Sequence, residues 1–124
     1  MTKEINSLVL AYLGDTIYED YIREYLIKKG IGNVHELQEA SMNYVSAKSQ
    51  ARILEELINK NIFNEEELEI IKRARNNNSH KAPKSCDPVT YRKATGLEAL
   101  IGYLRLEKNN QRIDEIMNEV LKES

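Results

Sequence analysis

Apolar residues recur at alternating intervals of three and four along most of the chain, which is the period of a helix with one buried face. The first such stretch covers residues 5–27 and ends at residues 30–33, where two glycines stop a helix at little cost. Its apolar positions are Ile5, Leu8, Val9, Tyr12, Leu13, Ile17, Tyr21, Ile22, Tyr25 and Leu26. The pattern predicts one long helix with these side chains on a single buried stripe.

The same periodicity predicts further helices over residues 34–43, 46–60, 65–75, 89–106 and 110–122. The helix over 34–43 would turn Val34, Leu37 and Ala40 inward. Ser46 and Asn64 have side chains that cap helix N-termini, and three glutamates follow Asn64 at the positive end of the helix dipole. The expected fold class is therefore all-α, a helical bundle in a single domain over residues 1–124.

Composition narrows the class of protein. The chain has 124 residues, of which 41% are hydrophobic and 31% charged, as in an ordinary globular domain. The single cysteine, Cys86, excludes an internal disulfide framework, and His35 and His80 lack the paired spacing of a zinc site. No apolar run approaches the roughly 20 residues that span a bilayer, and the start has no signal-peptide pattern. We expect a cytoplasmic protein without membrane contact.

Residues 76–88 lack periodicity and contain both prolines. A loop of this length in a compact domain is usually functional or disordered. Although the net charge of the chain is −2, residues 72–93 carry +6 with His80 neutral, which leaves −8 for the rest. Such a local excess attracts polyanions. The alternative is a solvated loop that is basic without function.

Two carboxylates lie among small and apolar residues. Asp15 follows Gly14 at the edge of the first apolar stripe, where a glycine costs about 1 kcal/mol relative to alanine and allows a helix or a ligand to approach closely. Glu98 lies between Gly96 and Gly102 in an apolar stretch and is expected to be at least half buried. Such a carboxylate needs a cation, a hydrogen-bond donor or a raised pKa. The two acids suggest a Mg²⁺ site, against the alternatives of a solvated acid and an ordinary buried ion pair.

The segments around these acids resemble the ribonuclease III family. Residues 10–19, LAYLGDTIYE, are similar to its signature pattern L-E-F-L-G-D-[SA], and residues 95–102, TGLEALIG, are similar to its second motif, D-x-x-E-A-L-[IL]-[GA]. Residues 44–48 and 72–76 resemble segments of the short Mini-III subfamily. The resemblance extends in order over nearly the whole chain.

The chain departs from the family pattern at two positions. Ala11 and Thr95 stand where ribonuclease III has acids, each one helical turn before a retained acid. Mini-III members share this reduction. Fewer carboxylates imply more contacts through water and a higher magnesium requirement.

The resemblance implies an endoribonuclease that hydrolyses double-stranded RNA with Mg²⁺, for which Mn²⁺ is a substitute, and leaves 5′-phosphate and 3′-hydroxyl ends. Asp15 and Glu98 would be both the catalytic residues and the metal ligands. It also implies a homodimer with Gly14 of the first helix at the interface. The implied substrate is precursor large-subunit (23S-type) ribosomal RNA, and the need for a ribosomal-protein helper stays open. The alternatives are a catalytically inactive helical module that binds structured RNA and a helical protein-interaction module.

Ribonuclease III usually has a double-stranded-RNA-binding domain after its catalytic domain, whereas this chain stops at Ser124. We therefore expect the catalytic domain itself to hold RNA, by shape more than by sequence and with an affinity that falls as salt rises. The candidate RNA-binding residues are Arg73, Arg75, Asn76, Ser79, His80, Lys81 and Lys84.

Overall fold

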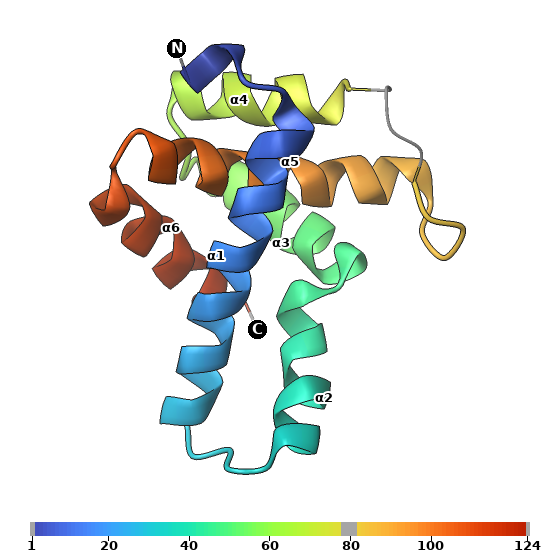
Figure 1. The fold of residues 1–124 in the computed structure, drawn as a ribbon, viewed down its shortest axis with the longest axis vertical. Helices are drawn as coiled ribbons and strands as arrows, with labels where there is room; N and C mark the ends of the chain where they lie inside the picture. Colours follow the sequence, from blue (N-terminus) through green and yellow to red (C-terminus); the bar gives the residue numbers. More distant parts are fainter. Residues whose placement is uncertain (1, 78–81, 124) are drawn as a thin grey trace.

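A computed structural model describes residues 2–77 and 82–123. Within these ranges the regular structure is helical throughout, so the all-α prediction is confirmed. The elements are η1 (Thr2–Glu4), α1 (Ser7–Lys28), α2 (Val34–Val45), α3 (Ala47–Asn59), α4 (Glu65–Arg75), α5 (Pro88–Leu106) and α6 (Asn110–Lys122) (Figure 1). The predicted ends of the six α-helices agree within two residues.

The helix ends are determined by local capping. Each of α1–α6 begins after a residue whose side-chain oxygen accepts a backbone N–H of the first turn. These residues are Asn6, Asn33, Ser46, Asn64, Asp87 and Asn109. The predicted caps at Ser46 and Asn64 are therefore confirmed. Asn64 also forms a reciprocal capping box with Glu67.

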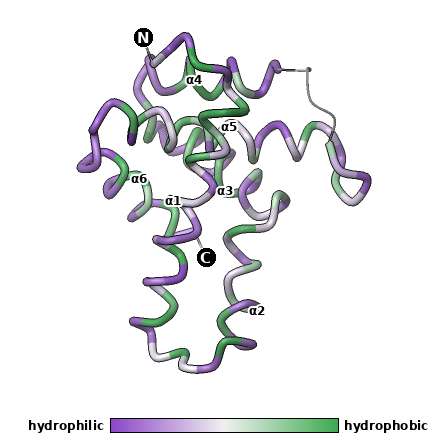
Figure 2. Tube along the Cα trace, in the orientation of Figure 1, coloured by the Kyte–Doolittle hydropathy of each residue, from purple (hydrophilic) through white to green (hydrophobic). Residues whose placement is uncertain are grey.

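Helix α5 forms the centre of the molecule and packs against α1, α3, α4 and α6. Nearly every residue from 94 to 104 is buried. Helix α1 crosses α5, while its C-terminal half extends away beside α2 as an arm (Figure 1). Hydrophobic residues concentrate where α1 meets α5, and hydrophilic residues dominate the loop before α5 (Figure 2). The core therefore lies around α5.

The crossing of α1 and α5 depends on two glycines. A Cβ at Gly14 would lie 1.8 Å from the carbonyl oxygen of Glu98, and one at Gly102 would lie 1.9 Å from that of Leu10. Backbone thus meets backbone, and the expectation that Gly14 allows a helix to approach is confirmed. Gly14 itself is covered by α5 of the same chain, so this close contact lies within one copy, and the interface expected at the first helix stays a prediction.

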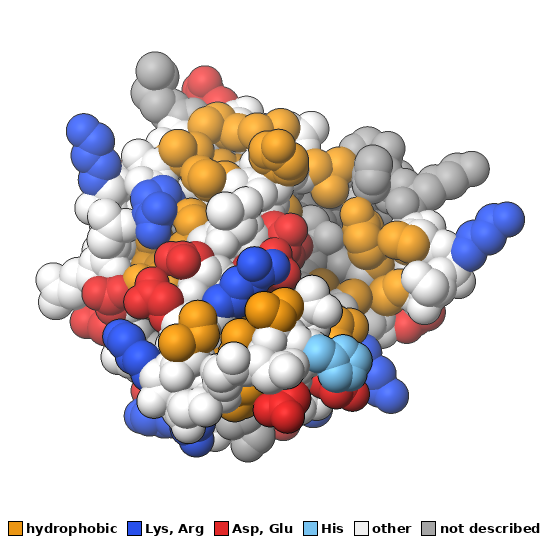
Figure 3. All heavy atoms as spheres, turned by 60° about the horizontal axis from the view of Figure 1, so that its bottom comes forward, with side chains coloured by type: hydrophobic (Ala, Val, Ile, Leu, Met, Phe, Trp, Pro, Cys, Tyr) orange, Lys and Arg blue, Asp and Glu red, His pale blue; other side chains and the backbone are white. Residues whose placement is uncertain are grey.

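Three apolar residues assigned to buried faces are exposed. Val9 is 57% exposed, Tyr12 85% and Val34 70%. Successive helical residues point about 100° apart, so once Leu10 and Gly14 face α5, Val9 and Tyr12 project away from it. Val34 is the first residue of α2, which buries only its far end. Figure 3, in which the bottom of Figure 1 comes forward, shows hydrophobic side chains at the surface among charged ones.

An ion pair joins α4 to α6. The Arg112 guanidinium donates through Nε and Nη2 to the two carboxylate oxygens of Glu67, at 2.7 and 2.8 Å, and Nη2 also donates to the Ile62 carbonyl at 2.7 Å. The Glu67 side chain is only 3% exposed. Because Glu67 also caps α4, one carboxylate stabilises both a helix start and a contact between helices.

Of the helices in the described ranges, none combines the length and the apolar character needed to cross a membrane.

Candidate active site

The two predicted acids line one pocket, although they are far apart in the sequence. The pocket has a volume of about 410 Å³ and lies between α1, α3 and α5. Asp15 reaches it from α1 and Glu98 from α5, with Tyr12 and Tyr91 also on its wall. The backbone contact at Gly14 brings the two acids together, because Gly14 touches the carbonyl of Glu98 itself.

The environment of Glu98 opposes its negative charge. Burial is the largest cause, followed by a hydrogen bond with the Asp15 carboxyl and repulsion from its charge, and together they raise the pKa of Glu98 to about 9. Glu19, one turn after Asp15, adds repulsion, whereas a hydrogen bond from Gln50 acts in the opposite direction. Asp15 is exposed and Glu98 partly buried. The pair is therefore an electrostatically strained site that a cation would relieve.

This strain predicts a pH dependence of folding. The folded-state pKa of Glu98 lies above its ordinary value of 4.5, so its stabilising contribution is complete below that value and is lost as pH rises toward 9. Without divalent cations, we expect the free energy of unfolding of wild type, relative to Glu98→Gln, to fall by more than about 1 kcal/mol from pH 5 to pH 8. Urea unfolding at both pH values measures this difference. Glu24→Gln, an exposed change, serves as the control, and parallel pH curves for wild type and Glu98→Gln would contradict the prediction.

Gln50 is a member of the site that the sequence prediction missed. It projects from α3, is 2% exposed, and its Nε2 donates to Glu98 Oε2 at 3.3 Å. A signal was present, because Gln50 lies three residues after Ala47 and three before Ile53, which places it on the same helical face as these apolar residues. A buried carboxamide needs a hydrogen-bond partner, and here that partner is Glu98.

Neither of the two positions where the family pattern has an acid, Ala11 and Thr95, supplies another group in place of the missing carboxylate. Ala11 and Thr95 are 6% and 5% exposed and line the same pocket. The Thr95 hydroxyl donates to the Tyr91 carbonyl at 2.9 Å, within its own helix. The carboxylates and the carboxamide on the pocket wall are thus those of Asp15, Glu98 and Gln50, and all three groups bear oxygen.

This donor set suits a hydrated Mg²⁺. The ion prefers oxygen ligands and usually keeps several waters, so a pair of carboxylates such as Asp15 and Glu98 fits it. In the part of the chain that the structure describes, no three His, Cys, Asp or Glu side chains gather in a way that could hold a metal ion. A metal bound here would consequently retain much of its water.

Among the candidate RNA-binding residues that the structure describes, the two arginines contact other parts of the chain. Arg73 donates to the backbone carbonyls of Lys3 and Ile5, and so secures the N-terminal segment. The aliphatic part of Arg75 lies against Gly96 of α5. These contacts give both arginines a structural role.

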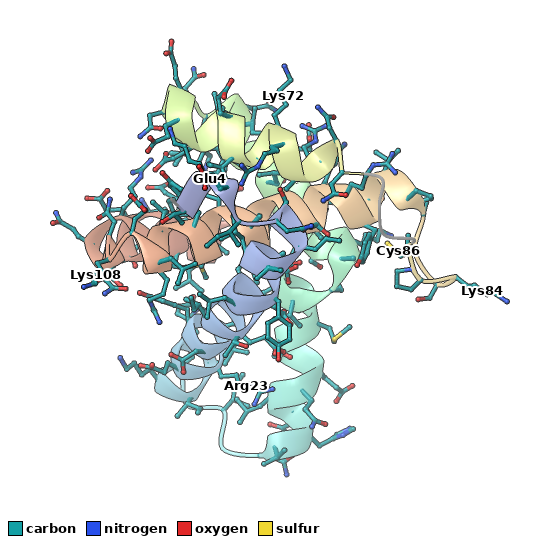
Figure 4. The ribbon with its side chains drawn as sticks, turned by 45° about the horizontal axis from the view of Figure 1, so that its top comes forward. Glu4, Arg23, Lys72, Lys84, Cys86 and Lys108 are labelled. Carbon is teal, nitrogen blue, oxygen red and sulfur yellow. The ribbon has the colours of Figure 1, made fainter. Side chains whose placement is uncertain are left out.

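The remaining candidates belong to the connection between α4 and α5. Asn76 is exposed and forms the C-cap of α4. Lys84 is exposed and extends away from the body of the molecule, beyond the N-terminal end of α5 (Figure 4). Ser79, His80 and Lys81 lie outside the described residues.

The fold and the pocket correspond to one protein family. The family model described as "Ribonuclease III domain" matches residues 8–109, which include both acids. The chain belongs to the ribonuclease III family of endoribonucleases, and within it to the Mini-III type.

The similarity extends to individual proteins along nearly their full length. "Mini-ribonuclease 3" of Staphylococcus aureus is 43% identical over 119 residues, which cover 96% of this chain and 89% of that protein. "Mini-ribonuclease 3" of Brevibacillus brevis is 46% identical over 114 residues, covering 92% and 84%. A crystal structure of a Fusobacterium nucleatum protein superposes with a TM-score of 0.82 at 39% identity, covering 96% of this chain and 93% of the other.

Proposed function

We propose that this chain hydrolyses phosphodiester bonds of double-stranded RNA with Mg²⁺, and that residues 1–124 act as a single catalytic domain. The observation that carries the proposal is the pairing of Asp15 and Glu98 in one pocket. Family membership supplies the reaction class, and 5′-phosphate and 3′-hydroxyl products follow from it.

Asp15 and Glu98 would hold the metal, directly or through water. When bound, Mg²⁺ would supply acidity to a water for in-line attack on phosphorus and stabilise the departing 3′ oxygen. Asp15 is exposed and would face the RNA, whereas Glu98 is partly buried and bound to α3 through its hydrogen bond with Gln50. Mn²⁺, which also accepts oxygen ligands, would substitute for Mg²⁺.

The test compares wild type with Asp15→Asn and Glu98→Gln on a long RNA duplex in Mg²⁺. We expect each substitution to reduce the cleavage rate by more than about 100-fold. Substitution of a residue that merely hydrogen-bonds to a metal ligand already reduces metal affinity or activity by about 10–100-fold, and here the ligand itself is changed. Asp20→Asn makes the same chemical change at an exposed site of α1 and should cut like wild type. Tight duplex binding without cleavage by wild type, even at high Mg²⁺, would instead favour the inactive RNA-binding module.

The proposal includes a homodimer with one pocket for each strand of the duplex, because a two-fold dimer matches the two-fold symmetry of the duplex. The exposed apolar side chains of Val9 and Tyr12 support it. Tyr12 also borders the pocket, so an interface there would lie next to the two acids.

We extend the proposal to the substrate through the Mini-III relationship. The substrate would be a duplex in precursor large-subunit ribosomal RNA, cut in the cytoplasm. A ribosomal protein is a candidate helper for this cleavage.

Lys84 and Arg75 are proposed to contact RNA phosphates at the side of the molecule where α5 begins. The double substitution Arg75→Ala with Lys84→Ala should weaken duplex binding and reduce the slope of log affinity against log salt by about 1 to 2. Filter binding at several salt concentrations measures both quantities. Lys28→Ala, at the far end of α1, should change neither. An unchanged slope in the double variant would exclude this surface.

A further inference from the structure

Gln50 occupies a position where an apolar residue would be expected. Its neighbours Ala51, Ile53 and Leu54 on α3 are all buried in the core, and Gln50 itself is 2% exposed. A carboxamide loses its hydration on burial, and this loss destabilises the fold unless a hydrogen bond compensates. The bond to Glu98 Oε2 at 3.3 Å provides that compensation and links α3 to the acid on α5.

The bond restricts Glu98 in a defined way. It engages one carboxylate oxygen from the α3 side, while Asp15 meets the carboxyl from α1. A flexible glutamate held on one side by the buried amide of Gln50 keeps its carboxylate aimed into the pocket. Such support from a neighbouring residue is how metal ligands are generally oriented in proteins.

The chemical type of Gln50 fits this task. A lysine or arginine at this position would neutralise Glu98 and compete with a metal ion for it. An apolar side chain would leave the Glu98 oxygen without a donor. A neutral carboxamide donates a hydrogen bond and leaves the negative charge of the two acids available to a cation.

We propose that Gln50 is a positioning residue, which orients Glu98 for binding of the divalent cation without being a required ligand itself. This inference rests on the proposed Asp15–Glu98 metal site. It assigns α3 a part in a site whose acids come from α1 and α5.

The experiment measures Mn²⁺ binding by electron paramagnetic resonance, with and without an RNA duplex. Gln50→Leu keeps the volume and removes the donor, so we expect about 10-fold weaker Mn²⁺ binding. Gln50→Asn retains an amide that is one methylene too short and should also bind Mn²⁺ more weakly, which keeps the test usable if the leucine variant does not fold. In cleavage assays, both variants should need about 10-fold more Mg²⁺ for half-maximal rate and recover most of the rate at saturation.

Two controls distinguish loss of the positioning of Glu98 from a general destabilisation of the fold. Ile53→Val perturbs the buried face of the same helix at a residue outside the pocket, and Gln111→Leu makes the same chemical change at an exposed site. Both should bind Mn²⁺ like wild type. An equal loss of Mn²⁺ affinity in Ile53→Val would overturn the positioning role.

The variants of the acids distinguish failure of the inference from failure of the metal site. Weakened Mn²⁺ binding in Asp15→Asn and Glu98→Gln, together with wild-type affinity in both Gln50 variants, would overturn the role of Gln50 alone. Absence of Mn²⁺ binding to wild type in both conditions, or unchanged binding in both acid variants, would overturn the metal site and the inference with it.

Discussion

Replacing Gly14 with alanine is expected to destabilise the fold by about 3 kcal/mol or more, at the upper end of the range for overpacked sites. The new Cβ would lie 1.8 Å from the Glu98 carbonyl oxygen and 2.7 Å from its carbonyl carbon. Both are backbone atoms in the middle of a buried helix, so neither can rotate away as a side chain would. Helices α1 and α5 would have to separate, and the contact that places Asp15 beside Glu98 would open with them.

Urea unfolding of Gly14→Ala measures this effect. Gly32→Ala is the matched control, because a Cβ there meets nothing within 4 Å and the residue lies in a connection between helices. The control should retain wild-type stability or gain a few tenths of a kcal/mol through a less flexible unfolded chain. A loss below about 0.5 kcal/mol in Gly14→Ala would show that the crossing adapts to a methyl group.

Replacing Arg112 with methionine is expected to reduce the free energy of unfolding by about 3 kcal/mol, because it leaves the Glu67 carboxylate buried without its cation. Glu67 is 3% exposed and loses two hydrogen bonds, and the Ile62 carbonyl loses a third.

A double-mutant cycle checks the origin of this loss. Glu67→Gln removes the charge and keeps an oxygen for the capping bond from the Asn64 N–H. Combined with Arg112→Met, it should be more stable than Arg112→Met alone, since the unpaired charge is gone. Arg23→Met, at an exposed pair with Glu19 separated by 3.8 Å, should change stability by less than about 1 kcal/mol. No recovery in the double variant would assign the loss to packing of the Arg112 side chain instead.

The helices and the two acids could be predicted because their signals lie in consecutive residues. The spacing of apolar positions and the capping side chains at Ser46 and Asn64 place helix starts within two residues of those observed. Asp15 and Glu98 stand out because each is a charged residue in a segment of small and apolar residues. These features require no knowledge of distant parts of the chain.

Contacts between distant segments could not be predicted in the same way. Gln50 carried a local signal, a polar residue on an apolar face, but its partner on α5 is 48 residues away. Arg73 belongs to a basic segment, yet its guanidinium is engaged by the carbonyls of Lys3 and Ile5 rather than left for a ligand. A sequence pattern shows that a side chain needs a partner without showing which one it meets.

Helix α1 shows most clearly which features follow from the sequence and which depend on the tertiary structure. The sequence by itself determined that α1 is a helix, where it ends, and that it carries an acid beside a glycine. It has apolar residues on more than one side, and only the position of α5 decided that Leu10 and Gly14 are buried while Val9 and Tyr12 are exposed. That position depends on backbone contact at Gly14 and Gly102, two residues on separate helices. Helical period and capping act over a few residues, whereas burial depends on which helices meet.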